Sequence, residues 1–317
     1  MNSDPRYMRR ALELARHGEL DASPNPMVGA VIVAPDGRII GEGWHRRCGQ
    51  GHAEVNAVAS VRDKALLKDA TMYVTLEPCA HYGKTPPCAR LIIETGIPRV
   101  VIGCADPFAK VAGRGITMLR EAGVEVEVGM LEKECMALNE KFMTAHTHRR
   151  PFVTLKWAES ADGFIDGHIS TLLNSCAVHR LRATHDAILV GSGTWLADHP
   201  RLDTRLFAGH SPRRVVLDRR GRITDTPDDV LVMRDYGSLA EVLEMLYTDH
   251  GITSLLVEGG AEALRSFMDE GLWDRIRIER SPLAIHGKVP APSLPADIHI
   301  KGTAKTDNHD IIEITRQ

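Results

Sequence analysis

The chain has 317 residues, of which 43% are hydrophobic and 26% charged, and its formal net charge is −3. This length accommodates two domains with separate cores, and the composition is typical of a globular protein. The weakly acidic balance and the absence of a run of five or six like charges exclude a broad duplex-binding surface, so nucleic acid is not an expected partner.

No stretch of about 18 apolar residues is present. The N-terminal 20 residues also lack an apolar core of signal-peptide length. The sequence therefore predicts a cytoplasmic protein without a membrane segment. Six cysteines in a chain of this length do not make a disulfide framework, which directs attention to cysteines with metal-ligand partners.

Apolar periodicity and turn residues predict alternating helices and strands over the first 130 residues. Asp4 and Pro5 begin the first helix, and the turn at 35–37 joins the first two strands. The later elements are expected at 52–61 (helix), 71–76 (strand), 87–95 (helix), 100–104 (strand), 115–122 (helix) and 124–128 (strand). This alternation is typical of a three-layer α/β domain with a largely parallel sheet.

A predicted helix over 131–146 precedes a polar, proline-ended stretch at 148–151, which is typical of a domain boundary. The same kinds of element then return. Strands are expected at 152–158, 187–190, 214–217 and 254–257, and helices at 176–183, 239–246 and 261–271. We therefore expect two α/β domains, 1–146 and 151–317.

Four residues in the first domain predict a catalytic zinc site. His52 and Glu54 begin a predicted helix, Cys79 follows a strand, and Cys88 begins the next helix. One imidazole and two thiolates leave the fourth zinc position for water, whose pKa zinc lowers to about 7. A lone histidine at a helix start is usually a cap, and buried cysteines are usually plain hydrophobes. The combined pattern instead favours a zinc deaminase with Glu54 as proton shuttle.

Other polar residues near this pattern allow two interpretations each. His81 and Lys84 lie in the loop between the cysteines, where they bind a substrate edge or a phosphate, or belong to a polar surface loop. Asn25 lies in a proline-rich segment and offers the donor and acceptor that a base edge requires, although a plain turn explains the segment equally well. His45, at the end of the second strand, is ambiguous in the same way.

Together these motifs resemble one family, the bifunctional riboflavin-biosynthesis deaminase–reductases. The resemblance rests on the segments 24–29, 52–57, 75–79, 83–88 and 111–115, and it covers nearly all of residues 1–146. It implies a cytidine-deaminase-like αβα fold and a substrate, 2,5-diamino-6-ribosylamino-4(3H)-pyrimidinone 5′-phosphate, that loses its 2-amino group as ammonia. The zinc ligands would be His52, Cys79 and Cys88, with Glu54 as proton shuttle and Asn25, His45, His81 and Lys84 as substrate contacts.

The second half resembles the reductase domain of the same family, which is similar to dihydrofolate reductase. The matching segments are 154–156, 160–163, 181–183, 187–194, 197–200 and 257–260. The resemblance implies NADPH-dependent reduction of the ribosyl C1′, which gives the ribityl chain. The substrate contacts would be Lys156, Arg182, Leu202, Arg205 and Glu258. The cofactor contacts would be Ala158, Thr194, Asp198, Gly259 and Gly260.

Two glycine turns are compatible with phosphate binding in this half. Residues 258–260 and 191–193 each follow a predicted strand, where backbone amides at a helix start can hold a phosphate, but a tight turn explains both equally well. No Gly-x-Gly-x-x-Gly fingerprint is present, so a Rossmann domain is not indicated. The family commonly has a Ser and then a Trp in the stretch 166–170, and this sequence lacks the Trp. Asp166 is not assigned to phosphate binding because its charge would repel the ligand.

The leading hypothesis is one chain that first deaminates and then reduces a small pyrimidine ribosyl phosphate. A second hypothesis makes the C-terminal half a non-catalytic binding or assembly module. A third, a deaminase that acts on tRNA, is disfavoured by the long cysteine spacing, the acidic balance and an aromatic content of 5%. The sequence leaves the oligomeric state open, with a homo-oligomer among the alternatives.

Overall fold

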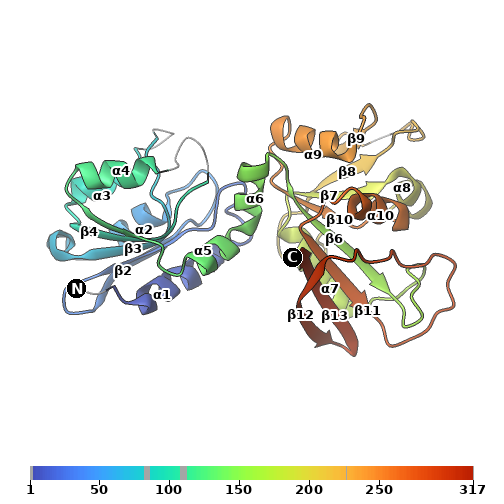
Figure 1. Ribbon diagram of the computed structural model, residues 1–317, viewed down its shortest axis with the longest axis horizontal. Coiled ribbons are helices and arrows are strands. Elements are labelled where there is room, and N and C mark those ends of the chain that lie inside the picture. The colour runs from blue at the N-terminus through green and yellow to red at the C-terminus, as the bar shows by residue number, and fades with distance from the viewer. Residues whose placement is uncertain (1–2, 82–85, 108–112, 226, 317) are drawn as a thin grey trace. The chain divides into compact units, whose positions relative to one another are not determined.

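The computed structural model describes residues 3–81, 86–107, 113–225 and 227–316. The chain forms two compact units, Met1–His148 and Arg149–Gln317, and each has its own sheet (Figure 1). None of the helices among the described residues has the length and apolarity needed to cross a membrane.

The first unit contains a five-stranded sheet in the order β2-β1-β3-β4-β5. The strands are β1 (Gly29–Val33), β2 (Ile39–Trp44), β3 (Thr71–Leu76), β4 (Arg99–Cys104) and β5 (Glu125–Val128). Strands β3, β4 and β5 are parallel, whereas β1 runs antiparallel to both β2 and β3. Among the described strands, β2, β3, β4 and β5 thus run in one direction, as a largely parallel sheet requires, and β1 of the predicted β1–β2 hairpin runs against them.

Helices cover both faces of this sheet and complete three layers (Figure 1). They are α1 (Pro5–Ala15), η1 (Arg16–Gly18), α2 (Ala53–Ser60), η2 (Lys64–Asp69), α3 (Cys88–Thr95), α4 (Arg114–Glu121), α5 (Glu132–Leu138) and α6 (Glu140–His148). Helix α1 begins as predicted, with the Asp4 carboxylate accepting a hydrogen bond from the Arg6 amide at 2.9 Å. Apolar residues of α1, α5 and α6 fill one side of the sheet, and those of α2, α3 and α4 the other.

Helix α2 lies unusually close to β2 because two glycines face it. A Cβ atom on Gly43 would lie 2.3 Å from the Ala57 nitrogen, and one on Gly41 2.7 Å from the Ala57 oxygen. The buried side of α2 is formed by Ala53, Glu54, Ala57 and Val58, whereas Val55 is 36% exposed. This close packing fixes the start of α2, where the predicted site residues lie.

The single helix predicted over 131–146 is two helices, α5 and α6, interrupted at Asn139. Asn139 is buried and leaves the helical conformation. Its side-chain amide donates to the Met27 carbonyl at 2.9 Å and accepts from the Met27 amide at 2.8 Å. The helix breaks because this polar side chain satisfies the backbone of the 24–28 segment instead of continuing a regular turn.

The second unit contains an eight-stranded sheet in the order β12-β13-β11-β6-β10-β7-β8-β9. The strands are β6 (Phe152–Glu159), β7 (Ala187–Gly191), β8 (Arg213–Leu217), β9 (Val230–Met233), β10 (Ser254–Val257), β11 (Arg275–Arg280), β12 (Ile298–Thr306) and β13 (His309–Arg316). All neighbouring pairs from β11 to β9 are parallel, and only β13 with its two neighbours is antiparallel among the described strands.

The helices described on this sheet are α7 (Leu172–Ala183), α8 (Ser192–Asp198), α9 (Leu239–Thr248) and α10 (Ala261–Asp269). Helices α9 and α10 bury an apolar face that contains Leu243 and Phe267. Apolar residues of α7 and α8 pack on a smaller cluster around Leu256. Helix α7 begins at residue 172 rather than 176, because the Thr171 hydroxyl accepts the Asn174 amide at 3.3 Å and caps it.

Candidate functional site

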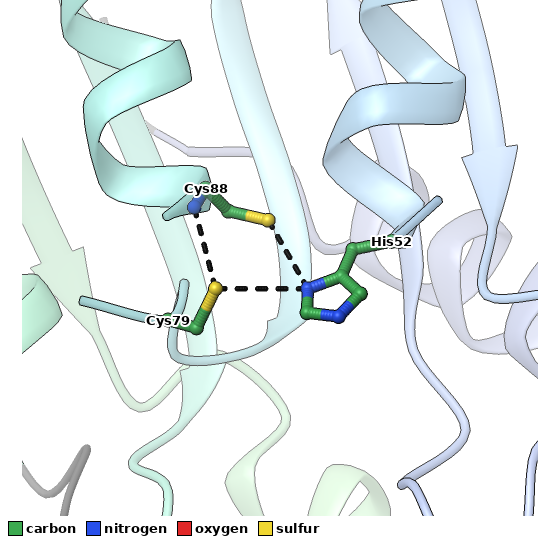
Figure 2. Close-up of side chains that lie close together, drawn as sticks. All are labelled: His52, Cys79 and Cys88. Carbon is green, nitrogen blue, oxygen red and sulfur yellow. Dashed lines mark hydrogen bonds between the residues drawn. The ribbon is translucent and has the colours of Figure 1, made fainter. Parts of the chain in front are cut away.

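The predicted zinc ligands come together in the first unit. The Nδ1 atom of His52 lies 3.3 Å from Sγ of Cys88 and 3.6 Å from Sγ of Cys79, and all three ligand atoms lie within 4.8 Å of one another (Figure 2). A tetrahedral zinc ion with Zn–N of about 2.0 Å and Zn–S of about 2.3 Å separates such atoms by about 3.5 Å. The three side chains therefore fit zinc as they stand. Within the described ranges no other group of three or more such side chains meets this criterion.

Helix starts position these ligands. His52 immediately precedes α2, and Cys88 is the first residue of α3, while Cys79 lies in the loop after β3. The Cys88 amide donates to Sγ of Cys79 at 3.3 Å. Hydrogen bonds from Cys88 and His52 lower the pKa of the Cys79 thiol. The thiolate form of Cys79, which is the form that binds zinc, is thus favoured. The N-termini of α2 and α3 also face the site, and their partial positive charge stabilises a thiolate.

Glu54 is the second residue of α2, and its side chain is 3% exposed. Burial raises the pKa of this carboxyl to about 7, and the nearby Cys79 charge acts in the same direction. A carboxyl group with such a pKa exchanges a proton readily at neutral pH. Its location two residues after His52 is the one expected for a proton shuttle.

Asn25 and His45, two of the predicted substrate contacts, lie beside the zinc ligands. Nδ1 of the buried His45 is 3.2 Å from the Gly51 carbonyl, so it carries the hydrogen, and Nε2 accepts from the Asn25 side chain at 3.1 Å. Burial lowers the pKa of His45, which keeps the ring neutral. The His45 ring meets the His52 ring edge to face, with centroids 5.4 Å apart. His81 is exposed, and Lys84 lies outside the described residues.

Glu77 was not predicted but supports the zinc site. This carboxylate, 3% exposed, precedes Pro78 and Cys79. It accepts backbone hydrogen bonds of 2.9–3.3 Å from four residues: Asp106, Gly113, Gly115 and Ile116. It thereby ties the segment that carries Cys79 to the start of α4. The sequence signal was a carboxylate directly after the strand predicted at 71–76.

Asn56 lies in the 52–57 segment, and the structure gives it a supporting role. Its side-chain amide donates to the carbonyls of Trp44 at 2.8 Å and Gly51 at 3.1 Å. Gly51 is the residue before His52, and its carbonyl also bonds His45. Asn56 therefore holds the loop that joins β2 to the first zinc ligand.

In the second unit, Arg182 and Glu258 form a buried pair. The Arg182 guanidinium donates to both carboxylate oxygens of Glu258, at 3.0 and 2.7 Å, and to the Asp203 carbonyl at 3.0 Å. These bonds use three of the five guanidinium N–H donors and hold Glu258 and the 199–211 loop in place. The substrate contact of Arg182 stays a prediction. Lys156 is half-buried on β6, on the same face of the sheet.

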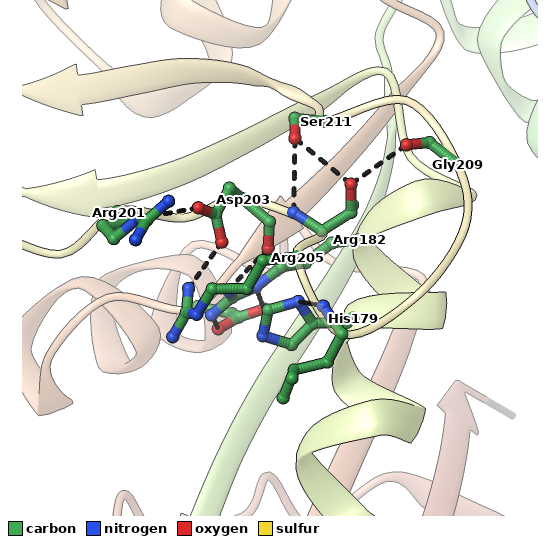
Figure 3. Close-up of polar contacts among 10 residues, drawn as sticks. His179, Arg182, Arg201, Asp203, Arg205, Gly209 and Ser211 are labelled. Atoms are coloured by element: carbon green, nitrogen blue, oxygen red, sulfur yellow. Dashed lines mark hydrogen bonds and ion pairs between the residues drawn. The ribbon is translucent and has the colours of Figure 1, made fainter.

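The 199–211 loop carries Leu202 and Arg205. Figure 3 shows Arg205 beside Asp203 and Arg201. Leu202 is buried, whereas Arg205 is exposed and pairs with Asp203, as Arg201 does at 2.8 Å. Nδ1 of His179 on α7 accepts the Leu206 amide at 3.2 Å. This hydrogen bond anchors the 199–211 loop to α7. The Arg205 side chain lies at the surface.

Three of the five predicted cofactor residues, Thr194, Gly259 and Gly260, lie together at the carboxyl ends of β7 and β10. The Gly260 amide donates to the Thr194 hydroxyl at 3.0 Å, and a Cβ on Gly259 would lie 3.2 Å from the Gly191 nitrogen. The glycine turns before α8 and α10 are thus adjacent. Ala158 is half-buried on β6, and Asp198 is exposed at the end of α8.

Asp166 has a structural role. Its carboxylate accepts the backbone amides of Lys288 at 2.7 Å and Val289 at 2.8 Å. Asp162 does the same with Ile285 and His286. The two aspartates fasten the loop after β6 to the 285–289 segment. This structural role agrees with the prediction that Asp166 does not bind a phosphate.

Each half of the chain matches a known protein family. Residues 1–104 match the cytidine and deoxycytidylate deaminase zinc-binding region, and residues 151–309 match the RibD C-terminal domain. The riboflavin biosynthesis protein RibD of Aquifex aeolicus is 38% identical over 88% of this chain and 87% of its own length. The RibD of Bacillus amyloliquefaciens is 40% identical over 91% of this chain and 86% of its own length. The chain belongs to the RibD family.

Solved RibD structures extend the likeness to the whole chain. The diaminohydroxyphosphoribosylaminopyrimidine deaminase/5-amino-6-(5-phosphoribosylamino)uracil reductase of Thermotoga maritima is 37% identical, with a TM-score of 0.89 over 99% of this chain and 98% of its own. Acinetobacter baumannii RibD is 33% identical, with a TM-score of 0.88 over the same shares. The predicted family and fold class are confirmed.

This RibD chain is a bifunctional deaminase and reductase of riboflavin biosynthesis, with a zinc-binding site at His52, Cys79 and Cys88. The match of the C-terminal half to the RibD C-terminal domain favours a reductase over a non-catalytic module.

Proposed function

We propose that the first unit deaminates 2,5-diamino-6-ribosylamino-4(3H)-pyrimidinone 5′-phosphate and that the second unit then reduces the ribosyl group of the product to ribityl with NADPH. The deamination is supported by the zinc-fitting geometry of His52, Cys79 and Cys88 beside the buried Glu54. The reduction is supported by the adjacent glycine turns and the charged residues on the neighbouring sheet face.

In the deaminase step, zinc supplies Lewis-acid activation of water when it is bound. Glu54 accepts the proton of the attacking water and returns it to the departing 2-amino nitrogen, for which a pKa of about 7 is well matched. Asn25 has amide groups left for a polar edge of the pyrimidine after its bond to His45. His45 remains neutral and orients Asn25, so no positive charge competes beside the metal ligands.

In the reductase step, the turn of Gly259 and Gly260, which carries no side chains, would let a cofactor phosphate approach the start of α10. Arg222 donates to the Ser192 hydroxyl at 2.7 Å, and Arg219 and Arg220 follow the same strand, β8. These three arginines at the carboxyl end of β8 favour the extra phosphate of NADPH over NADH. Lys156 and Glu258 would contact the substrate.

We also propose that the enzyme is cytoplasmic. All six cysteines are free, and Cys79 and Cys88 bind zinc only when they are reduced. The cytosol keeps thiols reduced and disulfides rare.

The Glu54→Ala variant tests the deaminase mechanism. It should retain zinc, because the three ligands are unchanged, and it should lose about 100-fold or more in ammonia release, since a positioned acid–base group contributes about 10²–10⁴. Zinc content by elemental analysis and ammonia release are measured together, with Glu13→Ala on the exposed side of α1 as control. Unchanged ammonia release in Glu54→Ala would refute the mechanism.

The reductase is tested with the deaminated product and NADPH. The absorbance of the reduced nicotinamide should fall when this product is supplied to either the wild type or Glu54→Ala. With the diamino substrate, only the wild type should oxidise NADPH. If the supplied product causes no oxidation, the C-terminal half is a binding or assembly module.

A further inference from the structure

Lys156 and Glu279 lie on the same face of the second sheet. Strands β6 and β11 are parallel, with Ala158 paired to Glu279 and Lys156 paired to Arg277. Side chains of paired residues, and of residues two apart on a strand, point to the same face. This is the face on which Arg182 of α7 meets Glu258. The two oppositely charged side chains are therefore neighbours within the proposed reductase site.

One oxygen of the Glu279 carboxylate is buried without a hydrogen bond. The Glu279 side chain is 2% exposed, and its Oε2 accepts the Ser170 hydroxyl at 2.7 Å. Its Oε1 has no hydrogen-bond partner within the described residues. Nε2 of His309 is 3.8 Å away, which is too long for a hydrogen bond, and lies 3.2 Å from the Ile169 carbonyl. Buried carboxylate oxygens are normally paired, so Oε1 is directed at a missing donor.

The ammonium group of Lys156 also lacks a partner. Among the residues that the structure describes, it makes neither a hydrogen bond nor an ion pair. Burial lowers its pKa, and the charges of Glu258 and Glu279 oppose this shift. An ammonium group with three donors thus faces two carboxylates without a direct bond to either, as expected for groups that meet through a ligand.

We propose that Glu279 is a substrate-binding residue of the reductase site, whose Oε1 accepts a hydrogen bond from a hydroxyl of the ribosyl chain while Lys156 donates to a neighbouring oxygen of that chain. The inference rests on the function proposed for the C-terminal unit. A hydroxyl group both donates and accepts, so adjacent hydroxyls satisfy a carboxylate and an ammonium together. A phosphate would be repelled by Glu258 and Glu279, which makes the sugar chain the fitting part of the substrate.

The first experiment compares Glu279→Gln with the wild type in the full-length enzyme. The amide has the size of the carboxylate, and its oxygen can keep the Ser170 bond while its NH₂ group replaces Oε1. The KM for the deaminated substrate should rise about tenfold or more, because a charge-assisted bond is lost, while the KM for NADPH changes less than about twofold. Glu313→Gln is the matched control, since Glu313 lies on β13 and pairs with Arg277 at 2.9 Å.

The second experiment does not depend on the stability of the variant. Wild-type enzyme is assayed with substrate analogues that lack the 2′- or the 3′-hydroxyl of the ribosyl chain. One of them should show a KM raised about tenfold in the wild type, and Glu279→Gln should not distinguish that analogue from the natural substrate. Ammonia release by each variant reports on the first unit and should not change.

The outcomes separate this inference from the proposed function. If the wild type reduces no supplied product, the reductase assignment fails. If the wild type is active but Glu279→Gln has an unchanged KM, or both enzymes penalise the deoxy analogues equally, the role of Glu279 is wrong and Oε1 is satisfied by water alone.

Discussion

The Arg182 guanidinium and the Glu258 carboxylate form a bidentate ion pair between α7 and the end of β10. Their side chains are only 13% and 9% exposed. Since Glu258 is proposed to contact the substrate, Arg182 determines where that carboxylate lies. Three of the five guanidinium N–H donors make these bonds and the one to the Asp203 carbonyl, so two donors remain.

Arg182→Met should destabilise the second unit by about 3–5 kcal/mol, because Glu258 would remain as a buried, unpaired charge. Urea unfolding measures the loss. Arg201→Met, whose side chain is 72% exposed, should change the free energy of unfolding by about 0.5 kcal/mol or less. Equal effects of the two variants would contradict the structural role of the pair.

Removal of the metal should affect only one activity. His52, Cys79 and Cys88 all belong to the first unit, so a chelator should abolish ammonia release and leave NADPH oxidation with supplied deaminated product intact. Added zinc should restore ammonia release. Parallel assays of the two activities on one chelated sample make the comparison, and loss of both would show that the reductase depends on the metal.

Gly43→Ala should displace α2. The new Cβ would lie 2.3 Å from the Ala57 nitrogen, and overpacking of this kind costs about 1–3 kcal/mol. Since α2 carries Glu54 and follows His52, ammonia release should fall by about tenfold or more. Gly302→Ala is the control, because nothing lies within 4 Å of its Cβ position. Normal ammonia release in Gly43→Ala would show that α2 tolerates a shift.

Glu77→Gln should weaken the first unit. The amide offers one oxygen to the four backbone N–H groups that Glu77 binds, and its own NH₂ group faces donors. We expect a loss of about 2–3 kcal/mol in the free energy of unfolding. Denaturant titration measures it, with Glu125→Gln, 70% exposed, as control. A loss no larger than that of the control would show that the loop is held by other contacts.

The contact of His179 with the Leu206 amide predicts a pH dependence. Burial lowers the pKa of His179, and its Nδ1 must be unprotonated to accept this bond. The unfolded chain then binds more protons than the folded one below about pH 6.5, so this contribution is complete above that value and decreases as the pH falls. His179→Asn, whose oxygen can replace Nδ1, should flatten the change in unfolding free energy between about pH 7.5 and 5.5. If the unfolding free energies of the wild type and His179→Asn change equally with pH, the predicted role of His179 is wrong.

Most elements before residue 271 were predictable because local signals agree with the tertiary structure. The Asp4–Pro5 helix start and the glycine turn after β1 are examples. Asn139 could not be predicted as a helix break, since its partner is Met27, far away in sequence. Strands β12 and β13 were missed because β12 is polar and exposed and their turn uses Asp307 and Asn308, both with positive φ, instead of a glycine.

The zinc ligands were predictable because metal chemistry restricts both residue types and spacing. Asn25 and His45 were named from the sequence, but only the structure brings them together. Pairs such as Ser170 with Glu279 leave no local signal, because a carboxylate on a strand is usually a solvent-facing residue. Long-range polar contacts therefore account for most of what the sequence did not predict.

Strand β13 (His309–Arg316) lies inside the second sheet, between β11 and β12. During synthesis on the ribosome, β11 therefore has no outer neighbour until residues 309–316 have been added. The first unit is complete by His148 and can fold while the rest is being translated, as N-terminal domains generally do. In each newly made molecule, the deaminase domain should accordingly be folded before the reductase domain.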